Sequence, residues 1–455
     1  MSADDASWLH LDRRPRETLR AAVERALREA ITGGALRAGT RLPSSRRLAE
    51  SLGVSRGVTS EAYARLAGQG FLAARAKATP VVAEVWTASP RPDRAPAPVG
   101  RIRFDLTATT PDVTLFPANR WLAAMRAAIG QAPPRSFDYG DVRGAIELRE
   151  ALADYLGRVR GAVVDAERVV IVQGTAQGID MLARVLAARG ARRAVLNDPG
   201  LPSQWDRFVE AGLEVAGQPV DAEGLVVDGM HGDAVLTTPA HQFPTGAVLS
   251  GPRRRALLAW ARGCGALVIE DDYDAEFRYG QESVPALQGL GPESVAYVGT
   301  ASKTLMPALR LGWVVLPATL VAEAARLKNL LDAGSPTFPQ RALAILLRSG
   351  EYERHLRRVR AVYRRRRDRL IAALDGHLPS LAVEGIAAGV HVLLRLPKDA
   401  DDRAAAQRAE RAGIRVAALS EFARASTGRG LVLGFGRLVE EDVEPAIAAL
   451  ARVLG

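Results

Sequence analysis

Residues 299–310 read GTASKTLMPALR, and this stretch gives the clearest indication of the fold. It follows Val295–Val298, an apolar run typical of a buried strand. Lys303 lies among hydroxyl side chains, with Arg310 seven residues further on. A lysine can form a Schiff base with a carbonyl group, while hydroxyls and an arginine can hold a phosphate. The stretch therefore indicates a site for a phosphorylated carbonyl cofactor, although a single lysine more often lies on a surface.

Upstream of this stretch, short apolar runs alternate with helical segments. The runs are Arg168–Val172, Arg193–Leu196, Ala234–Thr237 and Ala266–Glu270. This alternation predicts an α/β domain with a mostly parallel sheet. Ligands of such sheets bind at the carboxyl ends of the strands. Polar residues that we expect to meet there are Thr175, Asp198, His241, Asp271 and Tyr273.

Two of these strand ends carry groups suited to a pyridine cofactor. An acid can pair with the pyridine nitrogen and keep it protonated as an electron sink, and Asp271 fits this role. Tyr273 stands beside it to bond the ring hydroxyl. Gly174–Thr175–Ala176 begins a helix after a strand, where backbone N–H groups can take a phosphate. The alternative is a structural or metal-binding acidic cluster. A metal is less favoured, because no histidine lies nearby at ligand spacing.

The first 80 residues have a different pattern and carry more than half of the net charge of +10. Leu19, Val23, Leu27 and Ile31 recur every four residues and predict an amphipathic helix that ends at Gly33-Gly34. Two shorter helices follow, which open at Pro43-Ser44-Ser45, where a serine can cap the helix, and at Val54-Ser55-Arg56, and they are joined by a turn at Gly53. This arrangement predicts a helix-turn-helix, with an ordinary three-helix cap as the alternative.

In a helix-turn-helix, the second of the paired helices enters the major groove of DNA. Arg56 is then placed to contact a guanine edge, while serine, threonine and other arginine side chains are placed to hold phosphates. We expect double-stranded DNA to be contacted by seven residues, namely Arg41, Ser44, Ser45, Arg46, Ser55, Arg56 and Thr59.

Longer motifs extend both patterns. The N-terminal stretch LPSSRRLAESLGVSR (42–56) resembles the winged helix-turn-helix domain of the GntR family of regulators. The remainder resembles fold type I aminotransferases, which use pyridoxal 5'-phosphate (PLP). Its motifs are YGDVRGAIELR (139–149), DPGLP (198–202), TPAHQFPTG (238–246), EDDYDAEF (270–277) and GTASKTLMPALR (299–310). The two together resemble the MocR subfamily, whose members fuse these domains.

The resemblance implies a role for each matching residue. Lys303 is the Schiff-base lysine, Asp271 the partner of the pyridine nitrogen and Tyr273 that of the ring hydroxyl. Glu270 and Asp272 remain alternatives to Asp271, because the acid lies closer to the tyrosine than in ordinary aminotransferases. The phosphate cradle comprises Thr175, the backbone of Ala176, Thr300, Arg310 and, from the partner subunit of a homodimer, Tyr139. His241 and Gln242 lie where the family contacts the ring.

Three departures from the family patterns bear on function. The wing, residues 75–80, lacks the usual glycines, which leaves its DNA contacts open. Leu201 occupies the place of the aromatic residue that stacks on the cofactor, with Trp205 the nearest aromatic. Val432 stands where aminotransferases carry the arginine that binds the substrate carboxylate, and the alternatives Arg429 and Arg437 are out of register with that position. A missing arginine disfavours efficient transamination and favours a regulator that senses the cofactor or a small amine adduct of it.

These patterns divide the chain into three parts. We expect a DNA-binding domain in residues 1–83, a proline-rich linker in residues 84–103, and a PLP-binding effector and dimerisation domain in residues 104–455. No run is apolar enough for a membrane span and no secretory signal is recognisable, so we expect a cytoplasmic protein. The single cysteine excludes an internal disulfide. Regulation of vitamin B6 or amine and amino-acid metabolism is expected from the family, with an active aminotransferase as the alternative.

Overall fold

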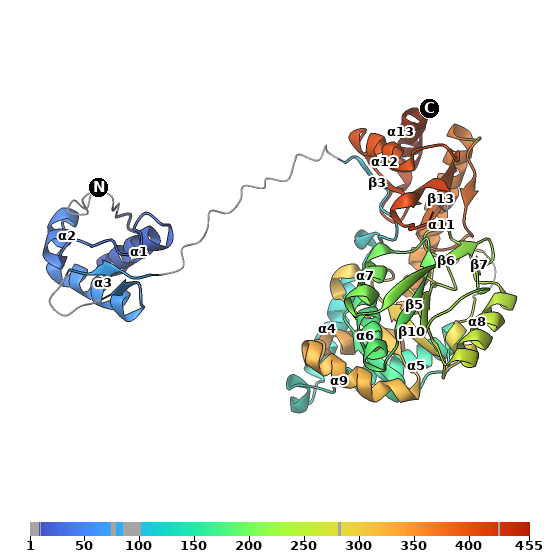
Figure 1. Ribbon diagram of the computed structural model, residues 1–455, viewed down its shortest axis with the longest axis horizontal. Helices are drawn as coiled ribbons and strands as arrows, with labels where there is room; N and C mark the ends of the chain where they lie inside the picture. Colours follow the sequence, from blue (N-terminus) through green and yellow to red (C-terminus); the bar gives the residue numbers. More distant parts are fainter. Residues whose placement is uncertain (1–8, 10, 74–78, 85–101, 281–283, 426–427) are drawn as a thin grey trace. The chain divides into compact units, whose positions relative to one another are not determined.

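The computed structural model describes residues 9, 11–73, 79–84, 102–280, 284–425 and 428–455. The chain divides into two compact units, Met1–Pro98 and Val99–Gly455, and each is described by itself (Figure 1). Most of the predicted linker and residues 75–78 of the predicted wing lie outside the described residues.

The first unit is a winged helix-turn-helix, as the sequence predicts. It contains α1 (Leu19–Thr32), α2 (Ser45–Leu52), α3 (Arg56–Gly68) and an antiparallel pair, β1 (Leu72–Ala73) with β2 (Val81–Val82). The Ser44 side chain accepts a hydrogen bond from the backbone of Arg47 and so caps α2. Gly53 ends α2 with a left-handed φ of 65° that favours glycine and sets the tight turn into α3. Val23, Leu27 and Ile31 of α1 are fully buried in the core of this unit.

The second unit is built on an eight-stranded sheet in the order β4-β11-β10-β9-β8-β5-β6-β7 among the described residues. The neighbouring strands from β10 through β9, β8 and β5 to β6 are parallel, while β11 and β7 run antiparallel to their neighbours. The prediction of a mostly parallel sheet is therefore correct. The bounds are β4 (Val169–Val172), β5 (Arg193–Asp198), β6 (Glu214–Asp221), β7 (Gly224–Leu225), β8 (Ala234–Thr237), β9 (Leu267–Asp272), β10 (Val295–Thr300) and β11 (Gly312–Val315).

Helices cover both faces of this sheet (Figure 1). One face packs on α6 (Thr175–Ala188), α7 (Pro202–Glu210) and α9 (Val321–Asp332), with Val170 and Val298 in the shared core. The other face contributes Ile171 and Trp313 to a core shared with α5 (Ile146–Arg160), α10 (Thr337–Arg348) and α11 (Glu351–His377). The remaining α-helices of this unit are α4 (Ala118–Gly130), α8 (Gly251–Cys264), α12 (Asp402–Arg411) and α13 (Val443–Leu454) among the described residues.

A smaller sheet near the C-terminus has the strand order β12-β13-β16-β15. Its strands are β12 (Val383–Glu384), β13 (His391–Leu396), β15 (Ala417–Ala418) and β16 (Arg429–Gly434), and a separate pair joins β14 (Ile414–Arg415) to β3 (Phe104–Asp105). The arginine-rich segment 354–369 lies within α11 and buries Tyr363 and Arg366 while exposing other arginines. The segment is thus part of one amphipathic helix.

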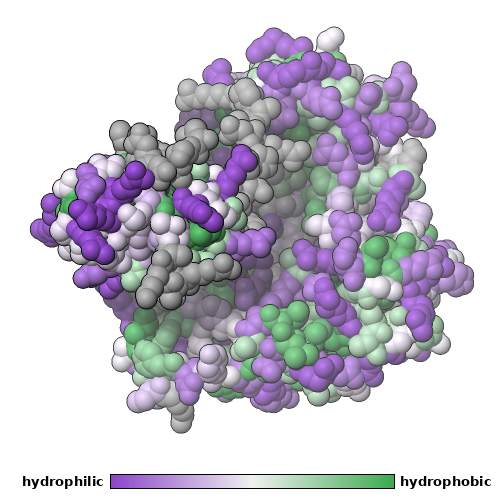
Figure 2. All heavy atoms as spheres, turned by 60° about the vertical axis from the view of Figure 1, so that its left-hand side comes forward, coloured by the Kyte–Doolittle hydropathy of each residue, from purple (hydrophilic) through white to green (hydrophobic). Residues whose placement is uncertain are grey.

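The visible surface is mainly hydrophilic and is interrupted by separate apolar patches (Figure 2). None of the helices formed by the described residues is both long and apolar enough to cross a lipid bilayer.

Candidate functional site

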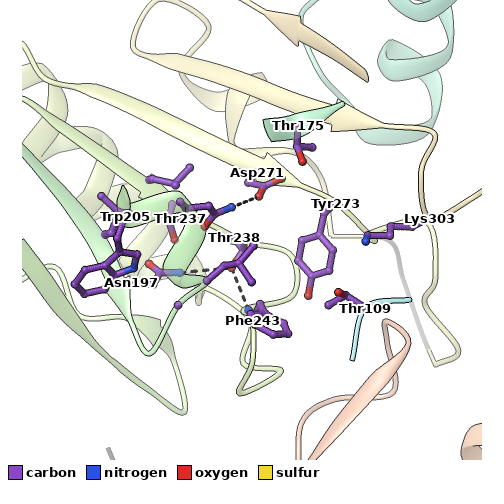
Figure 3. A pocket seen from close by; sticks show the side chains of 15 residues that line it. Thr109, Thr175, Asn197, Trp205, Thr237, Thr238, Phe243, Asp271, Tyr273 and Lys303 are labelled. Carbon is purple, nitrogen blue, oxygen red and sulfur yellow. Dashed lines mark hydrogen bonds between the residues drawn. The ribbon is translucent and has the colours of Figure 1, made fainter. Parts of the chain in front are cut away.

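A pocket lies at the carboxyl ends of the parallel strands in the second unit, where the sequence analysis places the ligand (Figure 3). Lys303, Asp271, Tyr273 and Thr175 all line it. The other lining residues are Thr109, Leu196, Asn197, Gly200, Leu201, Gln204, Trp205, Leu236, Thr237, Thr238 and Phe243. Sequence motifs thus located the pocket and contain about half of its lining residues, whereas Thr109, Asn197 and Gln204 lie outside every motif and predicted strand.

Asp271 carries an unused acceptor. Its Oδ2 accepts a hydrogen bond of 2.7 Å from Gln204 Nε2, whereas Oδ1 is buried without a hydrogen-bond partner among the described residues. Burial raises the pKa of Asp271 to about 7, against the lowering effects of the Gln204 hydrogen bond and the Lys303 charge. A buried acceptor without a donor is costly. A protonated ring nitrogen would supply that donor, so this carboxyl group fits a pyridine cofactor.

The two neighbouring acids have other partners. Side chains alternate along a strand, so Glu270 and Asp272 project from the face of β9 opposite to Asp271. Glu270 accepts hydrogen bonds from the backbone of Leu287 and Gln288. Asp272 is paired with Arg160 at 2.8 Å, and both side chains are buried. The geometry therefore favours Asp271 over the two alternatives that the sequence left open.

Lys303 follows β10 and lies in the pocket with Tyr273. Burial lowers the pKa of Lys303 below its ordinary value, which increases the fraction of neutral, nucleophilic amine. Burial also raises the pKa of Tyr273, with Asp274 adding to that effect, so the phenol keeps its proton at ordinary pH. The pocket thus combines an amine able to attack a carbonyl group with a neutral hydroxyl.

The N-terminus of α6 borders the same pocket. Gly174 adopts a φ of +83°, and a Cβ there would lie 2.9 Å from the Arg310 guanidinium. Arg310 donates a hydrogen bond of 2.6 Å to the Gln173 carbonyl, which holds the guanidinium beside Thr175 and Ala176 at the start of the helix. Backbone N–H groups and a cation together form a suitable cradle for a phosphate.

Two predicted cofactor contacts lie elsewhere. The Thr300 hydroxyl is buried and bonds to Ser302 Oγ and the Leu311 carbonyl, so Thr300 supports the lysine loop and does not line the pocket. His241 is also buried and absent from the lining, because it lies behind Tyr273, with Nδ1 3.3 Å from the tyrosine hydroxyl. Arg310 and Ala176 are also absent from the lining, so contacts of these four residues with a cofactor remain predictions.

His241 belongs to a buried cluster with Asp274 and His391. One nitrogen or oxygen atom of each lies within 4.8 Å of the others, so the fold brings histidines to the acidic segment although none is near it in sequence. His241 Nδ1 and Asp274 Oδ2 already form a hydrogen bond of 2.9 Å. His391, by contrast, has no hydrogen-bond partner at either ring nitrogen among the described residues. We interpret His241 and Asp274 as a hydrogen-bonded pair, and the absence of a metal remains a prediction.

Tyr139 is 89% exposed and does not line the pocket of its own chain. The role expected of it, contact with a phosphate across a dimer, remains a prediction. Val432 is fully buried in β16, packed in an apolar cluster with Phe243, Tyr273 and Leu419. Arg437 is paired with Asp105 at 2.8 Å instead of facing the pocket. Lys303 is the one cationic side chain among the described lining residues.

The predicted DNA-contacting residues lie in the first unit. Arg41, Ser44, Arg46, Ser55 and Arg56 are exposed and Ser45 is partly exposed. Arg46 forms an exposed ion pair with Glu50 that DNA phosphates could replace. The prediction for Thr59 is wrong. Its side chain is fully buried and donates a hydrogen bond of 2.7 Å to the Ser45 carbonyl, so it fastens α3 to α2 and is not available to DNA.

Comparisons with known proteins agree with both units. Residues 109–444 match the model of class I and II aminotransferases, and residues 19–81 match bacterial regulatory proteins of the gntR family. The chain is 33% identical to the HTH-type pyridoxine biosynthesis transcriptional regulator PdxR of Corynebacterium glutamicum, over 93% of each protein. It is 29% identical to the probable rhizopine catabolism regulatory protein MocR of Rhizobium meliloti, over 93% of this chain and 91% of that protein.

Among solved structures, an archaeal alanine:glyoxylate aminotransferase superposes with a TM-score of 0.71 and 28% identity, over 78% of this chain and 91% of that one. Fold and pocket thus define a class of protein, a helix-turn-helix regulator joined to an aminotransferase-like domain. Within that class, the chain belongs to the MocR subfamily of gntR-family transcriptional regulators.

Proposed function

We propose that this regulator binds PLP in its second unit and that PLP, as effector or co-effector, changes its affinity for a DNA operator. Residues 1–83 would bind the operator, residues 84–103 would link the domains, and residues 104–455 would bind PLP and dimerise. The names of the relatives that regulate pyridoxine biosynthesis and rhizopine catabolism support target genes of vitamin B6 or amine metabolism.

The unpartnered Oδ1 of Asp271 carries the proposal, because it gives a pyridine nitrogen a buried acceptor beside Lys303. When bound, PLP would supply an aldehyde for attachment to an amine and a ring that withdraws electrons. Lys303 would provide the amine, and Asp271 would hold the proton on the ring nitrogen. Thr175, the Ala176 backbone and Arg310 would hold the phosphate.

The wall of the pocket supports regulation over steady transamination. An amino-acid substrate needs a cation for its carboxylate. Val432 and its apolar neighbours fill the place expected for that arginine, and the described lining offers no cation besides Lys303. The alternative, an active aminotransferase with a DNA-binding domain, is favoured by the intact Lys303–Asp271 pair. Measured turnover of an amino donor and a keto acid would establish it.

A homodimer would complete the phosphate site through Tyr139. Phe137, two residues before Tyr139, is 62% exposed and its ring lies 5.1 Å from that of Phe338. Exposed aromatic side chains at this segment suit a surface that a second copy covers. Equilibrium ultracentrifugation of the purified chain tests this part.

The central experiment compares the wild type with Lys303→Ala. We expect added PLP to give the wild type a visible absorption band that Lys303→Ala lacks. We also expect the apparent operator affinity, measured by fluorescence anisotropy, to change with PLP in the wild type and not in the variant. Absence of a band in the wild type would refute cofactor binding. A band with unchanged operator affinity and dimer geometry would refute the effector role, since an effector must distinguish two states.

A further inference from the structure

Tyr273 has two buried partners behind the pocket that no cofactor contact explains. His241 Nδ1 lies 2.9 Å from Asp274 Oδ2 and 3.3 Å from the Tyr273 hydroxyl. The three side chains are 3%, 1% and 8% exposed in that order. They come from the segment after β8 and the segment after β9, and the fold closes them into one polar group behind the pocket.

The fold makes room for this group at one position. Gly389 has a φ of +66°, and a Cβ there would lie 2.1 Å from His241 Cε1 and 2.6 Å from Asp274 Oδ2. Only glycine permits both this backbone conformation and this approach. The backbone at Gly389 therefore packs directly against the histidine–carboxylate pair.

The hydrogen positions follow from the chemistry of the three groups. An ionised carboxylate only accepts hydrogen bonds, so the His241 Nδ1 that faces Asp274 carries a proton. That nitrogen is then a donor, and it cannot also accept the tyrosine proton. The Tyr273 proton has two destinations, the Asp274 carboxylate or the pocket. By donating to Asp274, His241 reduces the attraction of that carboxylate for the phenol and leaves the tyrosine proton directed at the pocket.

Given the proposed PLP site, we propose that His241 and Asp274 are positioning residues. They set how strongly Tyr273 donates its proton to the ring hydroxyl oxygen of the cofactor. His241 strengthens that donation and Asp274 weakens it. The two residues thus act in opposite directions on the same proton, which a purely structural role would not produce.

Several other charged or titratable groups surround this proton. They are Asp271 and Asp272 of β9, Lys303 after β10, His391 of β13, and Arg278 and Arg310. None of them changes in the variants below, so their fields are constant across the comparison. A donor to the ring oxygen stabilises the deprotonated form of the bound cofactor, and a nearby carboxylate disfavours it.

The test measures the pH midpoint of the visible spectrum of the PLP-loaded full chain. We expect His241→Phe, which removes the N–H, to raise the midpoint by about one pH unit or more, and Asp274→Asn to lower it by a similar amount. His241→Asn keeps an N–H near the Nδ1 position and should stay close to the wild type. In a Tyr273→Phe background, His241→Phe should cause no further shift, because the coupling passes through Tyr273.

Results that differ from these expectations overturn the inference. Three results would show that His241 does not act through Tyr273. The midpoint shifts in His241→Phe and Asp274→Asn could have the same sign, or a well-folded His241→Phe could show no shift. In the third, His241→Phe shifts the midpoint equally with and without the Tyr273 hydroxyl. Circular dichroism of each variant identifies misfolding, and a misfolded His241→Phe leaves Asp274→Asn and His241→Asn to decide. A wild type without any cofactor band would overturn the proposed function as well, whereas a band without these shifts overturns the positioning role alone.

Discussion

Asp271→Asn should affect the ligand-free and the PLP-bound protein in opposite directions. Burial raises the pKa of Asp271 from 3.8 to about 7, so between these values the folded protein retains a proton that the unfolded chain releases. Folding therefore becomes less favourable as the pH rises from 3.8 to 7. At about 1.4 kcal/mol per pH unit, this costs about 4 kcal/mol at pH 8. Asparagine removes the cost and can still accept the hydrogen bond from Gln204.

PLP binding should respond in the other direction. Because Gln204 occupies the one amide oxygen of asparagine, Asp271→Asn loses the charge-assisted hydrogen bond to the ring nitrogen, which is worth about 1.5–3 kcal/mol. The Kd for PLP should therefore rise roughly 10- to 150-fold.

Two titrations measure these effects. Urea unfolding of the ligand-free chain at pH 5 and pH 8, followed by the signal of the second unit, should show Asp271→Asn gaining stability mainly at pH 8. Absorbance titration with PLP gives the Kd. Asp206→Asn, on the exposed side of α7, is the matched control and should change neither quantity. An unchanged Kd, or a loss of stability at pH 8, would refute the assignment of Asp271 to the ring nitrogen.

Three further predictions concern both units. Arg56→Ala should weaken operator binding by about 1–3 kcal/mol and relax the preference for one base, which a competition assay with substituted operators measures; uniform weakening on every sequence would instead indicate a phosphate contact. Thr59→Val removes the hydrogen bond to the Ser45 carbonyl and should lower the stability of the first unit by about 1–3 kcal/mol in thermal unfolding, while Thr59→Ser should retain most of it. Gly389→Ala should lower the free energy of unfolding of the second unit by more than 2 kcal/mol, because its Cβ would overlap His241; unaltered unfolding would mean that the backbone shifts freely there.

The sequence predicted the architecture because its evidence is local. The spacing of Leu19, Val23, Leu27 and Ile31 specifies a helix face, and alternating apolar runs specify a mostly parallel sheet. The motifs around Asp271 and Lys303 likewise lie at strand ends, and parallel strands bring such ends to one edge. That topological rule let the sequence place both residues in one pocket.

Tertiary structure decided which side chains face the ligand. The sequence predicts ligand contacts for Thr59, Thr300 and His241, yet in the fold each hydroxyl or imidazole contacts other groups of the protein. Gln204 faces Asp271 from 67 residues away, and no local pattern marks it.

The sequence alone therefore determined that this chain joins a winged helix-turn-helix to an aminotransferase-like domain, and which strand ends form its pocket. Only the tertiary structure distinguished Asp271 from Glu270 and Asp272, and brought His241, Asp274 and the distant His391 together. Periodicity and motifs record contacts between residues close in sequence. The direction of a side chain depends instead on packing between segments that only the folded chain brings together.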